Sequence, residues 1–366
     1  MHTPRERGVP SEERGQTSST RAALDWDSVR LFLEVARRGS FRSAAEHLQL
    51  SVNVLRRRIE KLEQHLGVAL VTRHIDGIRT TAEGEQILAA AQRMERESFG
   101  LVRTRDVAAP AMSGEVKLAV TEGLGTFWIA PRLVEFQRAN PKLLVDIRCA
   151  MQSADVLRLE ADAAVQLSRP AAKDLKLVKL GRLHVMPFAA QSYLETYGYP
   201  KSVPDLLNHR IVLQVAEQVS SETEYNRLFP GVPQAGFVAM RTNVSSSHYW
   251  AIAKGAGIGM LPTYANAIAA RVVPIDIGLR VHYDIWLTYH SDANRIPRVR
   301  RMIDWLLEAF DAKRFQWFQD DFVHPKELAS EYRGAPLVNL FEGFFGEAYK
   351  PMQNSNLPRT PSAAAR

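Results

Sequence analysis

The stretch from Ser40 to Gly67 reads SFRSAAEHLQLSVNVLRRRIEKLEQHLG, and it decides how the first part of the chain folds. Apolar residues recur every three or four positions on either side of Gln49–Leu50, a pattern that indicates two helices joined by a tight turn. Ser40 and Ser51 each precede a helix, where a hydroxyl can accept a hydrogen bond from an unpaired backbone N–H. The stretch therefore predicts a helix-turn-helix over residues 41–60.

Another helix is expected upstream, between Trp26 and Arg38, with Gly39 as its stop. Its apolar residues share one face: Val29, Phe32, Leu33 and Ala36. In the next helix, Ala44 and Ala45 have side chains small enough for another helix to cross closely. The three helices are therefore expected to pack on one another.

The third helix has a face that is fixed by its apolar residues. Those expected to be buried recur at helical spacing: Leu55, Ile59, Leu62 and Leu66. The N-terminal end of the helix should then offer four side chains to solvent: Val52, Asn53, Arg56 and Arg57. Asparagine and arginine can form paired hydrogen bonds with adenine and guanine edges, and valine can pack on a thymine methyl group. This helix is therefore expected to read the DNA major groove, the alternative being a scaffold with a solvated basic face.

After Gly67, the sequence VALVTRHIDGIRTTAEG predicts two short strands with a turn at Asp76–Gly77, which together form a wing. Arg73 and Arg79 are placed to reach phosphates or the minor groove, although either could be an ordinary surface charge. The complete set of expected DNA contacts is Ser40, Arg42, Ser51, Val52, Asn53, Arg56, Arg57, Arg73 and Arg79.

The bulk properties of the chain are those of a globular protein with more than one domain. Its 366 residues are too many for one ordinary core, and 46% of them are hydrophobic. A net charge of +7 is compatible with a polyanionic partner but does not establish one. The single cysteine, Cys149, excludes an internal disulfide, fits a reducing compartment, and is expected in the core because its strand is apolar. No apolar run is long enough to span a bilayer, and residues 1–23 resemble a disordered polar arm rather than a signal peptide.

The texture of the sequence divides the chain further. The DNA-binding domain is expected over residues 24–82, and a long linker helix follows over residues 83–111. From residue 112 to residue 312, short β-rich runs alternate with helical stretches, which favours a largely parallel α/β sheet. Residues 313–366 form a C-terminal extension that is expected to be partly disordered, and its aromatic part, 315–328, could fold over the domain or remain loose.

Many positions of the first domain resemble the winged helix-turn-helix of LysR-type transcriptional regulators. The matching residues are Phe32, Ser40, Phe41, Ala44, Ala45, Leu48, Ser51, Leu55, Arg57, Ile59, Leu62, Glu63, Leu66, Gly67, Leu70, Arg73, Thr81 and Gly84. The resemblance covers the chain from about Leu24 to Phe310. The chain departs from the usual pattern at Val52–Asn53, Arg56 and Val71, so no operator sequence can be borrowed from a relative.

The resemblance implies an α+β multidomain fold. It has an N-terminal winged helix-turn-helix, a long linker helix, and a C-terminal α/β two-lobed effector domain like that of periplasmic binding proteins. It also implies that linker helices pair two subunits, so that a homodimer or homotetramer binds a quasi-palindromic operator. The spacing of Ile87, Ala91, Met94 and Leu101 suits such pairing, although a helix packed on its own domain would look similar.

A small-molecule effector of unknown identity is expected between the two lobes. The helix after the strand 116–120 begins near Thr121, Gly125 and Thr126, and its free N–H groups would suit a carboxylate or another anion. Further candidates lie at a second helix start and after a strand: Asn243, Ser245, Ser246 and Gln166. Each of these residues could equally be a polar cap or an ordinary strand end.

The remaining motifs give no sign of catalysis. Gly255, Gly257 and Gly259 close a helix instead of opening one, so a nucleotide-binding loop is not expected. No metal-ligand spacing, nucleophile with a base, or cofactor motif is present, which argues against an enzyme. The sequence therefore predicts a cytoplasmic, nucleoid-associated regulator whose partners are promoter DNA, further copies of itself and RNA polymerase, with no membrane association. The rivals are a solute-binding receptor whose first domain mediates protein contacts, and an enzyme with an accessory DNA-binding domain.

Overall fold

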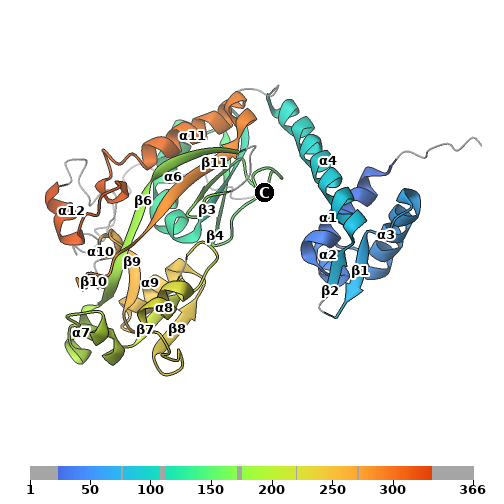
Figure 1. The fold of residues 1–366 in the computed structure, drawn as a ribbon. Coiled ribbons are helices and arrows are strands. Elements are labelled where there is room, and N and C mark those ends of the chain that lie inside the picture. The colour runs from blue at the N-terminus through green and yellow to red at the C-terminus, as the bar shows by residue number, and fades with distance from the viewer. Residues whose placement is uncertain are drawn as a thin grey trace, which may run out of the picture. The chain divides into compact units, whose positions relative to one another are not determined.

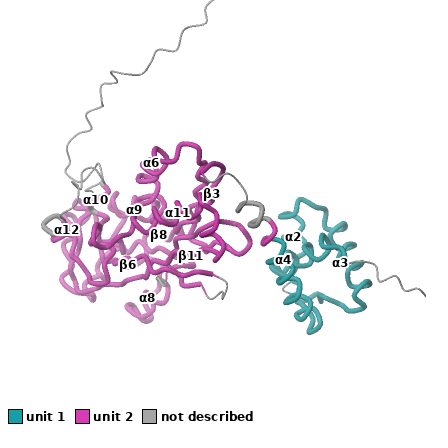
Figure 2. The backbone as a smooth tube through the Cα atoms, turned by 90° about the horizontal axis from the view of Figure 1, so that it is seen from above, with its two compact units in different colours: residues 1–98 teal, residues 99–366 magenta. Residues whose placement is uncertain are grey.

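The computed structural model describes residues 24–75, 77–107, 112–170, 175–219, 221–269 and 272–331. The chain divides into two compact units, residues 1–98 and 99–366 (Figure 2). The polar arm over residues 1–23, for which the sequence predicts disorder, lies outside the described residues. So do Asp76 in the wing turn and the part of the C-terminal extension after residue 331. None of the described helices is both long and apolar enough to cross a membrane.

The N-terminal unit consists of three helices, a wing and the start of a long helix (Figure 1). Its elements are α1 (Trp26–Arg38), α2 (Phe41–Leu48), α3 (Val52–Leu66), β1 (Val71–His74), β2 (Gly77–Thr80) and α4 (Ala82–Val107). The two strands pair antiparallel, as the sequence predicts. The core that the helices share includes the expected apolar faces, with Phe32, Leu33, Ala44, Leu55 and Ile59 at most 1% exposed.

Caps and a close backbone approach fix how the helices and the wing meet. The hydroxyls of Ser40 and Ser51 accept hydrogen bonds from the N–H groups of Ser43 (3.5 Å) and Val54 (3.3 Å). Gly39 ends α1 in the left-handed conformation, at a φ of 60° that favours glycine. Its carbonyl accepts a hydrogen bond from the Ile78 N–H of the wing (2.8 Å), so the turn after α1 holds the wing in place.

The helix α4 packs on its own unit at its start and is exposed further along. Ala91 is buried with the core of α1–α3, and Ile87 packs against it. The guanidinium of Arg37 joins α1 to α4, because it donates hydrogen bonds to the buried carboxylates of both Glu34 and Glu95. The stripe of apolar residues expected to pair two subunits is thus divided, and its first half belongs to the subunit's own core.

The C-terminal unit contains the remaining elements. They are β3 (Gly114–Thr121), α5 (Glu122–Leu124), the π-helix η1 (Gly125–Ile129), α6 (Ala130–Ala139), β4 (Leu143–Ala150), β5 (Ala163–Gln166), β6 (Leu175–Ala190), α7 (Gln191–Tyr197), η2 (Pro204–Asn208), β7 (Ile211–Gln214), α8 (Ser221–Leu228), β8 (Val238–Thr242), α9 (Ser245–Ala253), β9 (Gly259–Pro262), α10 (Ala265–Ala269), β10 (Val272–Pro274), β11 (Val281–His290), η3 (Ser291–Arg295), α11 (Pro297–Ala309), η4 (Gln316–Phe318) and α12 (Pro325–Glu331).

Its main sheet has seven strands in the order β10-β6-β11-β5-β3-β4, with β9 also paired to β6. Strands β3, β4 and β5 are parallel, whereas β6 runs antiparallel to β9, β10 and β11, and β11 runs antiparallel to β5. The expectation of a largely parallel sheet is therefore wrong for this unit. The short strands β7 and β8 form a separate parallel pair.

Two lobes share the long strand β6, which runs between them in Figure 1. Leu180 and Leu183 of β6 belong to the core of the first lobe, which contains β3, β5, α6 and α11. Ala189 and Ala190 of the same strand belong to the core of the second lobe, which contains α7, α8 and β7. The two-lobed architecture that the resemblance implies is confirmed.

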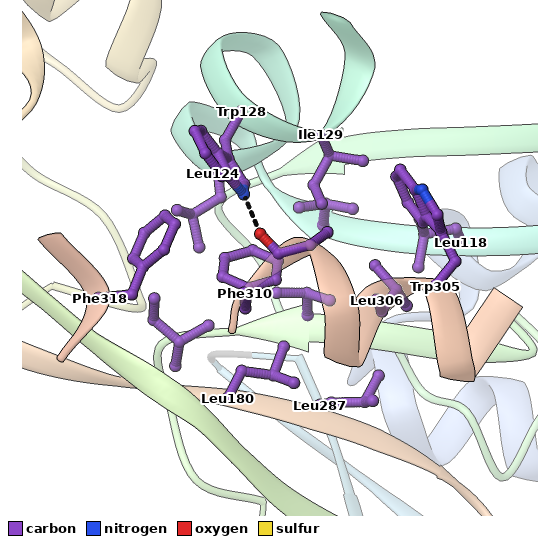
Figure 3. Packing of buried hydrophobic residues seen from close by; sticks show 14 of the residues in the cluster. Leu118, Leu124, Trp128, Ile129, Leu180, Leu287, Trp305, Leu306, Phe310 and Phe318 are labelled. Atoms are coloured by element: carbon purple, nitrogen blue, oxygen red, sulfur yellow. Dashed lines mark hydrogen bonds between the residues drawn. The ribbon is translucent and has the colours of Figure 1, made fainter. Parts of the chain in front are cut away.

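The core of the first lobe is built around Trp128 (Figure 3). Its indole N–H donates a hydrogen bond to the Ala309 carbonyl (3.0 Å), and the rings of Phe315, Trp317 and Phe318 lie edge-on to it at 4.9–5.4 Å between centroids. All three rings are at most 2% exposed. The core therefore continues past residue 312, where the sequence places the end of the domain.

Hydrogen bonds and ion pairs also hold the segment that follows these rings. The Lys179 ammonium donates to the Asp320 carboxylate (2.7 Å), and the His184 ring nitrogen lies 3.0 Å from the Gln319 carbonyl oxygen. Both contacts attach the segment to β6. Residues 315–328 are thus an integral layer of the C-terminal unit, not a loose extension.

Candidate nucleic-acid interface and effector cavity

The orientation of α3 is the one that the sequence predicts. Leu55 and Ile59 are buried, at 0% and 1% exposure, while Asn53 and Arg57 are exposed on the opposite face. The serine cap at Ser51 starts the helix so that both polar side chains lie in its first two turns. The N-terminal half of α3 thus offers hydrogen-bond donors to a partner outside the protein.

Two of the four side chains expected in solvent at this end are only half-exposed, which corrects that expectation. Val52 packs against the core of α1–α3, and the Arg56 guanidinium lies 5.5 Å from the centre of the Phe41 ring. The valine that meets solvent is instead Val54, which is 47% exposed. A thymine methyl would therefore meet Val54 more readily than Val52.

Of the remaining expected contacts on α2 and at the helix starts, Arg42 and Ser51 are exposed and Ser40 is half-buried. Arg42 is exposed and its Nε donates to the Glu46 carboxylate one turn later (3.2 Å). The hydroxyls of Ser40 and Ser51 are used as helix caps, so any contact with DNA would be made in addition to capping.

The wing presents its two arginines on opposite faces. Arg73 stands opposite Ile78 in the antiparallel pair and Arg79 stands opposite Thr72, and neighbouring positions of a strand point to opposite sides. Both arginines are exposed. The wing could therefore contact a phosphate on either side.

The second candidate site is a cavity of about 160 Å³ in the C-terminal unit. Residues of both lobes line it, with Thr121, Gly123 and Phe127 from the first lobe and Ile211 and His248 from the second. Thr121 and Ser245, two of the seven expected effector residues, are in its wall.

The other five expected effector residues are not among the residues that line this cavity. Gly125 packs against Cys149, since a Cβ there would lie 2.4 Å from the thiol sulfur. Gln166 is buried and its amide donates to the Ser168 carbonyl (2.9 Å). Thr126 and Asn243 are exposed, and the Thr126 hydroxyl donates to Glu122 (3.2 Å).

The backbone N–H of the fifth residue, Ser246, already has a negatively charged partner. Its backbone N–H, at the beginning of α9, donates to the Glu122 carboxylate (3.1 Å), so the protein's own anion lies there. After β3, moreover, the chain makes one turn of α-helix and then a π-helix at Gly125–Ile129, instead of the regular helix start that the sequence suggests.

Two residues that sequence reasoning missed shape the cavity wall. The Gln218 side-chain oxygen accepts hydrogen bonds from the Thr121 hydroxyl (2.6 Å) and the Leu167 N–H (2.9 Å), and it thereby fixes Thr121. Burial lowers the pKa of His248 to about 4, so its ring is neutral near pH 7, and its Nε2 lies 3.1 Å from the Val212 carbonyl oxygen. Their partners are distant in sequence, and no local motif signals either role.

Cys149 is exposed on β4, the edge strand of the sheet, so the expectation that it is a core residue is wrong. Desolvation by its neighbours and the nearby Glu122 carboxylate raise the pKa of its thiol. The described residues contain no group of three or more His, Cys, Asp or Glu side chains placed to hold a metal ion.

Comparison with known proteins identifies both units. The lysR family of bacterial regulatory helix-turn-helix proteins matches residues 26–85, and the LysR substrate binding domain matches residues 109–311. The second match alone covers more than half of the chain.

Individual relatives agree with this result. An HTH-type transcriptional regulator of Xanthomonas campestris pv. campestris (strain 8004) is 31% identical over 208 residues, which are 56% of this chain and 59% of that protein. The regulator PtxR of Pseudomonas aeruginosa is 27% identical over 308 residues, covering 81% of this chain and 97% of the relative.

A crystal structure of a full-length variant of AphB, the Vibrio cholerae virulence activator, shares the fold. Its TM-score is 0.51 at 19% sequence identity, over 77% of this chain and 97% of that chain. The chain therefore belongs to the LysR family of transcriptional regulators, with an N-terminal helix-turn-helix that binds DNA and a C-terminal effector-binding domain.

Proposed function

We propose that this regulator recognises promoter DNA through α3, with Asn53 and Arg57 contacting base edges in the major groove. The orientation of α3 carries the proposal, because Leu55 and Ile59 are buried while Asn53 and Arg57 are exposed. Arginine pairs with guanine and asparagine with adenine through two hydrogen bonds each. The arginines of α2 and the wing would then contact phosphates, which position the helix without reading sequence.

Replacement of Arg57 tests this proposal. Arg57→Ala is expected to lower the affinity for a promoter fragment by roughly 5- to 150-fold, the equivalent of about 1–3 kcal/mol for one base contact. The fragment is obtained by genomic footprinting of the bound chain, and affinity is measured by gel-shift titration. Arg138→Ala, which removes an exposed arginine of the C-terminal unit, is the matched control and should leave the affinity unchanged. Unchanged affinity of a folded Arg57→Ala chain would contradict the role given to α3.

We also infer that two copies pair through α4, as a homodimer or as a homotetramer of two dimers. The inference is supported by the second half of the apolar stripe on α4, which does not pack on its own subunit. There Met94 and Leu101 are 40% and 76% exposed. Apolar residues at helical spacing favour pairing of two helices. Two reading heads related by a two-fold axis would match a quasi-palindromic operator.

A charge placed on this stripe should weaken the pairing. Leu101→Glu puts a carboxylate where the paired helices would exclude water, so the dissociation constant of the dimer should rise at least about tenfold. Sedimentation velocity over a range of concentrations measures that constant. Leu307→Glu, at a leucine of α11 that is 40% exposed, serves as the control. If both variants associate like the unmodified chain, the subunits do not pair through this part of α4.

The effector-binding domain would act by a shift between arrangements of its lobes. Because residues of both lobes line the cavity, a small molecule bound there favours whichever arrangement it contacts better. The proposal needs no resident cofactor. It places the chain in the bacterial cytoplasm, at promoters in the nucleoid, where contact with RNA polymerase would carry the effect to transcription.

A further inference from the structure

The wall of the cavity carries almost no charge. Among the described residues that line it, none is Lys or Arg, and the one acidic residue is Glu224. Its carboxylate accepts hydrogen bonds from Arg227 of the same helix (2.6 and 3.0 Å). His248 adds no positive charge, because burial lowers its pKa to about 4. A negatively charged molecule would therefore find no positive side chain in this wall.

The apolar part of the wall comes from the cores of both lobes. Leu183 and Val185 of β6 belong to the core of the first lobe, while Leu206, Leu213 and Phe229 belong to that of the second. Such a surface favours molecules whose own surface is mostly hydrocarbon, since their transfer from water is favourable. Much of the cavity wall is therefore formed by side chains of the two hydrophobic cores.

The wall also contains the polar side chains of Thr121, Gln214 and Ser245. The Gln214 amide donates to the Ser245 hydroxyl oxygen (2.8 Å), and a Cβ at Gly123 would lie 3.0 Å from that oxygen. Thr121, two residues before Gly123, donates its hydroxyl to Gln218 (2.6 Å). These groups can offer a hydrogen bond to one polar group of a ligand, but they cannot neutralise a charge.

One carboxylate, that of Glu122, lies at the start of α9, where an anion would otherwise bind. Glu122 accepts the Ser246 N–H at the start of α9 (3.1 Å), and Ser246 is adjacent to Ser245 of the cavity wall. A carboxylate ligand near Ser245 would meet the like charge of Glu122 and lose its hydration without compensation. The local electrostatics therefore disfavour anions.

The volume of the cavity limits the size of the apolar part of a ligand. A cavity of about 160 Å³ compares with an apolar cavity of about 150 Å³ in another protein that binds benzene. We propose that the effector is an uncharged molecule with an apolar part about as large as one benzene ring and one hydrogen-bonding group directed at Thr121, Gln214 and Ser245. The proposal rests on the function proposed above and names the chemical class of the ligand.

Three probes that differ little in shape test the charge preference. Benzyl alcohol, benzamide and benzoate share the ring, and of these only benzoate is charged at pH 7. Isothermal titration of the full chain should show that at least one neutral probe binds at least tenfold more tightly than benzoate. Equal or tighter binding of benzoate, or no binding of either neutral probe at millimolar concentration, would overturn the proposal.

A variant that narrows the cavity shows where the probes bind. Leu279→Trp enlarges a half-buried side chain of the wall. It should lower the affinity for the tighter-binding neutral probe at least tenfold. Leu307→Trp makes the same change at an exposed site on α11, outside the wall, and should leave the binding unchanged. Should Leu279→Trp fail to fold by circular dichroism, Val219→Phe narrows the same cavity from a half-buried position. Undiminished binding to a folded narrowed variant would overturn the proposal.

A gel shift with the promoter fragment separates the failure of this inference from the failure of the proposed function. A chain that binds the fragment but prefers benzoate refutes the ligand class and leaves DNA recognition intact. A chain that binds neutral probes in the cavity but does not bind the fragment refutes DNA recognition and leaves the chemistry of the cavity intact.

Discussion

The solvent-facing side of α3 and the cavity of the C-terminal unit acquire their chemistry by different routes. On α3, Asn53 and Arg57 stand about one turn apart in a single helix, so local spacing directs both outward. In the cavity, Thr121, Gln214 and Ser245 come from β3, β7 and α9, and only the assembled fold brings them together. Substitutions on the α3 surface should therefore change binding alone, whereas substitutions around the cavity should change stability and binding together.

The largest effect is expected where the C-terminal unit joins its most distant segments. Trp317→Ala removes a ring that is 2% exposed and packs edge-on to Trp128. Removal of a buried tryptophan side chain should lower the free energy of unfolding by about 3–5 kcal/mol, through lost burial and the cavity that remains. Chemical denaturation of the full chain, followed by circular dichroism, measures the loss.

The matched control is Trp250→Ala, since Trp250 lies in the same unit but is 44% exposed. Its replacement should lower the free energy of unfolding much less than the replacement of Trp317 does. Equal losses for the two variants would mean that residues 315–328 do not belong to the core, and the contrast between surface and interior would fail for this segment.

A smaller effect is expected from the pH dependence of the cavity wall. The pKa of His248 is lowered from 6.5 to about 4 in the folded chain, so between these values the unfolded chain binds more protons. Its contribution to stability is complete above pH 6.5 and is lost as the pH falls toward 4, which amounts to about 3 kcal/mol. In His248→Gln this part of the loss should be absent when unfolding is measured across that range.

Carboxylates ordinarily titrate in the same pH range. The test is therefore the difference in pH-dependent stability between His248→Gln and the unmodified chain. His65→Gln, which makes the same replacement at an exposed position of α3, is the control variant. If His248→Gln and the unmodified chain lose stability in parallel, His248 is not held neutral in the wall, and the description of the cavity as uncharged is wrong at that residue.

The same contrast explains which features the sequence predicts. The helix-turn-helix, its serine caps and the buried stripe of α3 follow from spacing within one segment. They are observed, except that Leu66, at the end of the stripe, is only half-buried. The error at Val52 is also local. Val52 precedes Leu55 and Ile59 by three and seven positions, which places it near the core side of α3. Arg56 could not be placed in this way, because its position over Phe41 depends on a contact with α2.

The C-terminal unit is less accessible to such reasoning. The sequence predicts short β-rich runs in this unit, but it predicts neither the long strand β6 nor its antiparallel pairing with β11, about a hundred residues later. The aromatic segment 315–328 lacks a strong helical period, and its burial follows from the space around Trp128. Of the seven effector candidates, Thr121 and Ser245 line the cavity because α5, which follows β3, contacts α9, a fact that no local pattern contains.

The smallest effect on DNA affinity is expected from the wing. There, contacts with phosphates can be distinguished from the base contacts made by α3. Arg73 and Arg79 are exposed on opposite faces of the β1–β2 pair, and we expect them to contact phosphates. Each replacement by alanine should lower the log–log slope of DNA affinity against salt by about 1 and weaken all sequences nearly equally. Arg57→Ala should in addition reduce the preference for the promoter fragment over random duplex. Titrations of both duplexes at several salt concentrations measure the slope and the sequence preference of each variant. A wing variant that changes the sequence preference as strongly as Arg57→Ala would show that the wing arginine contacts bases.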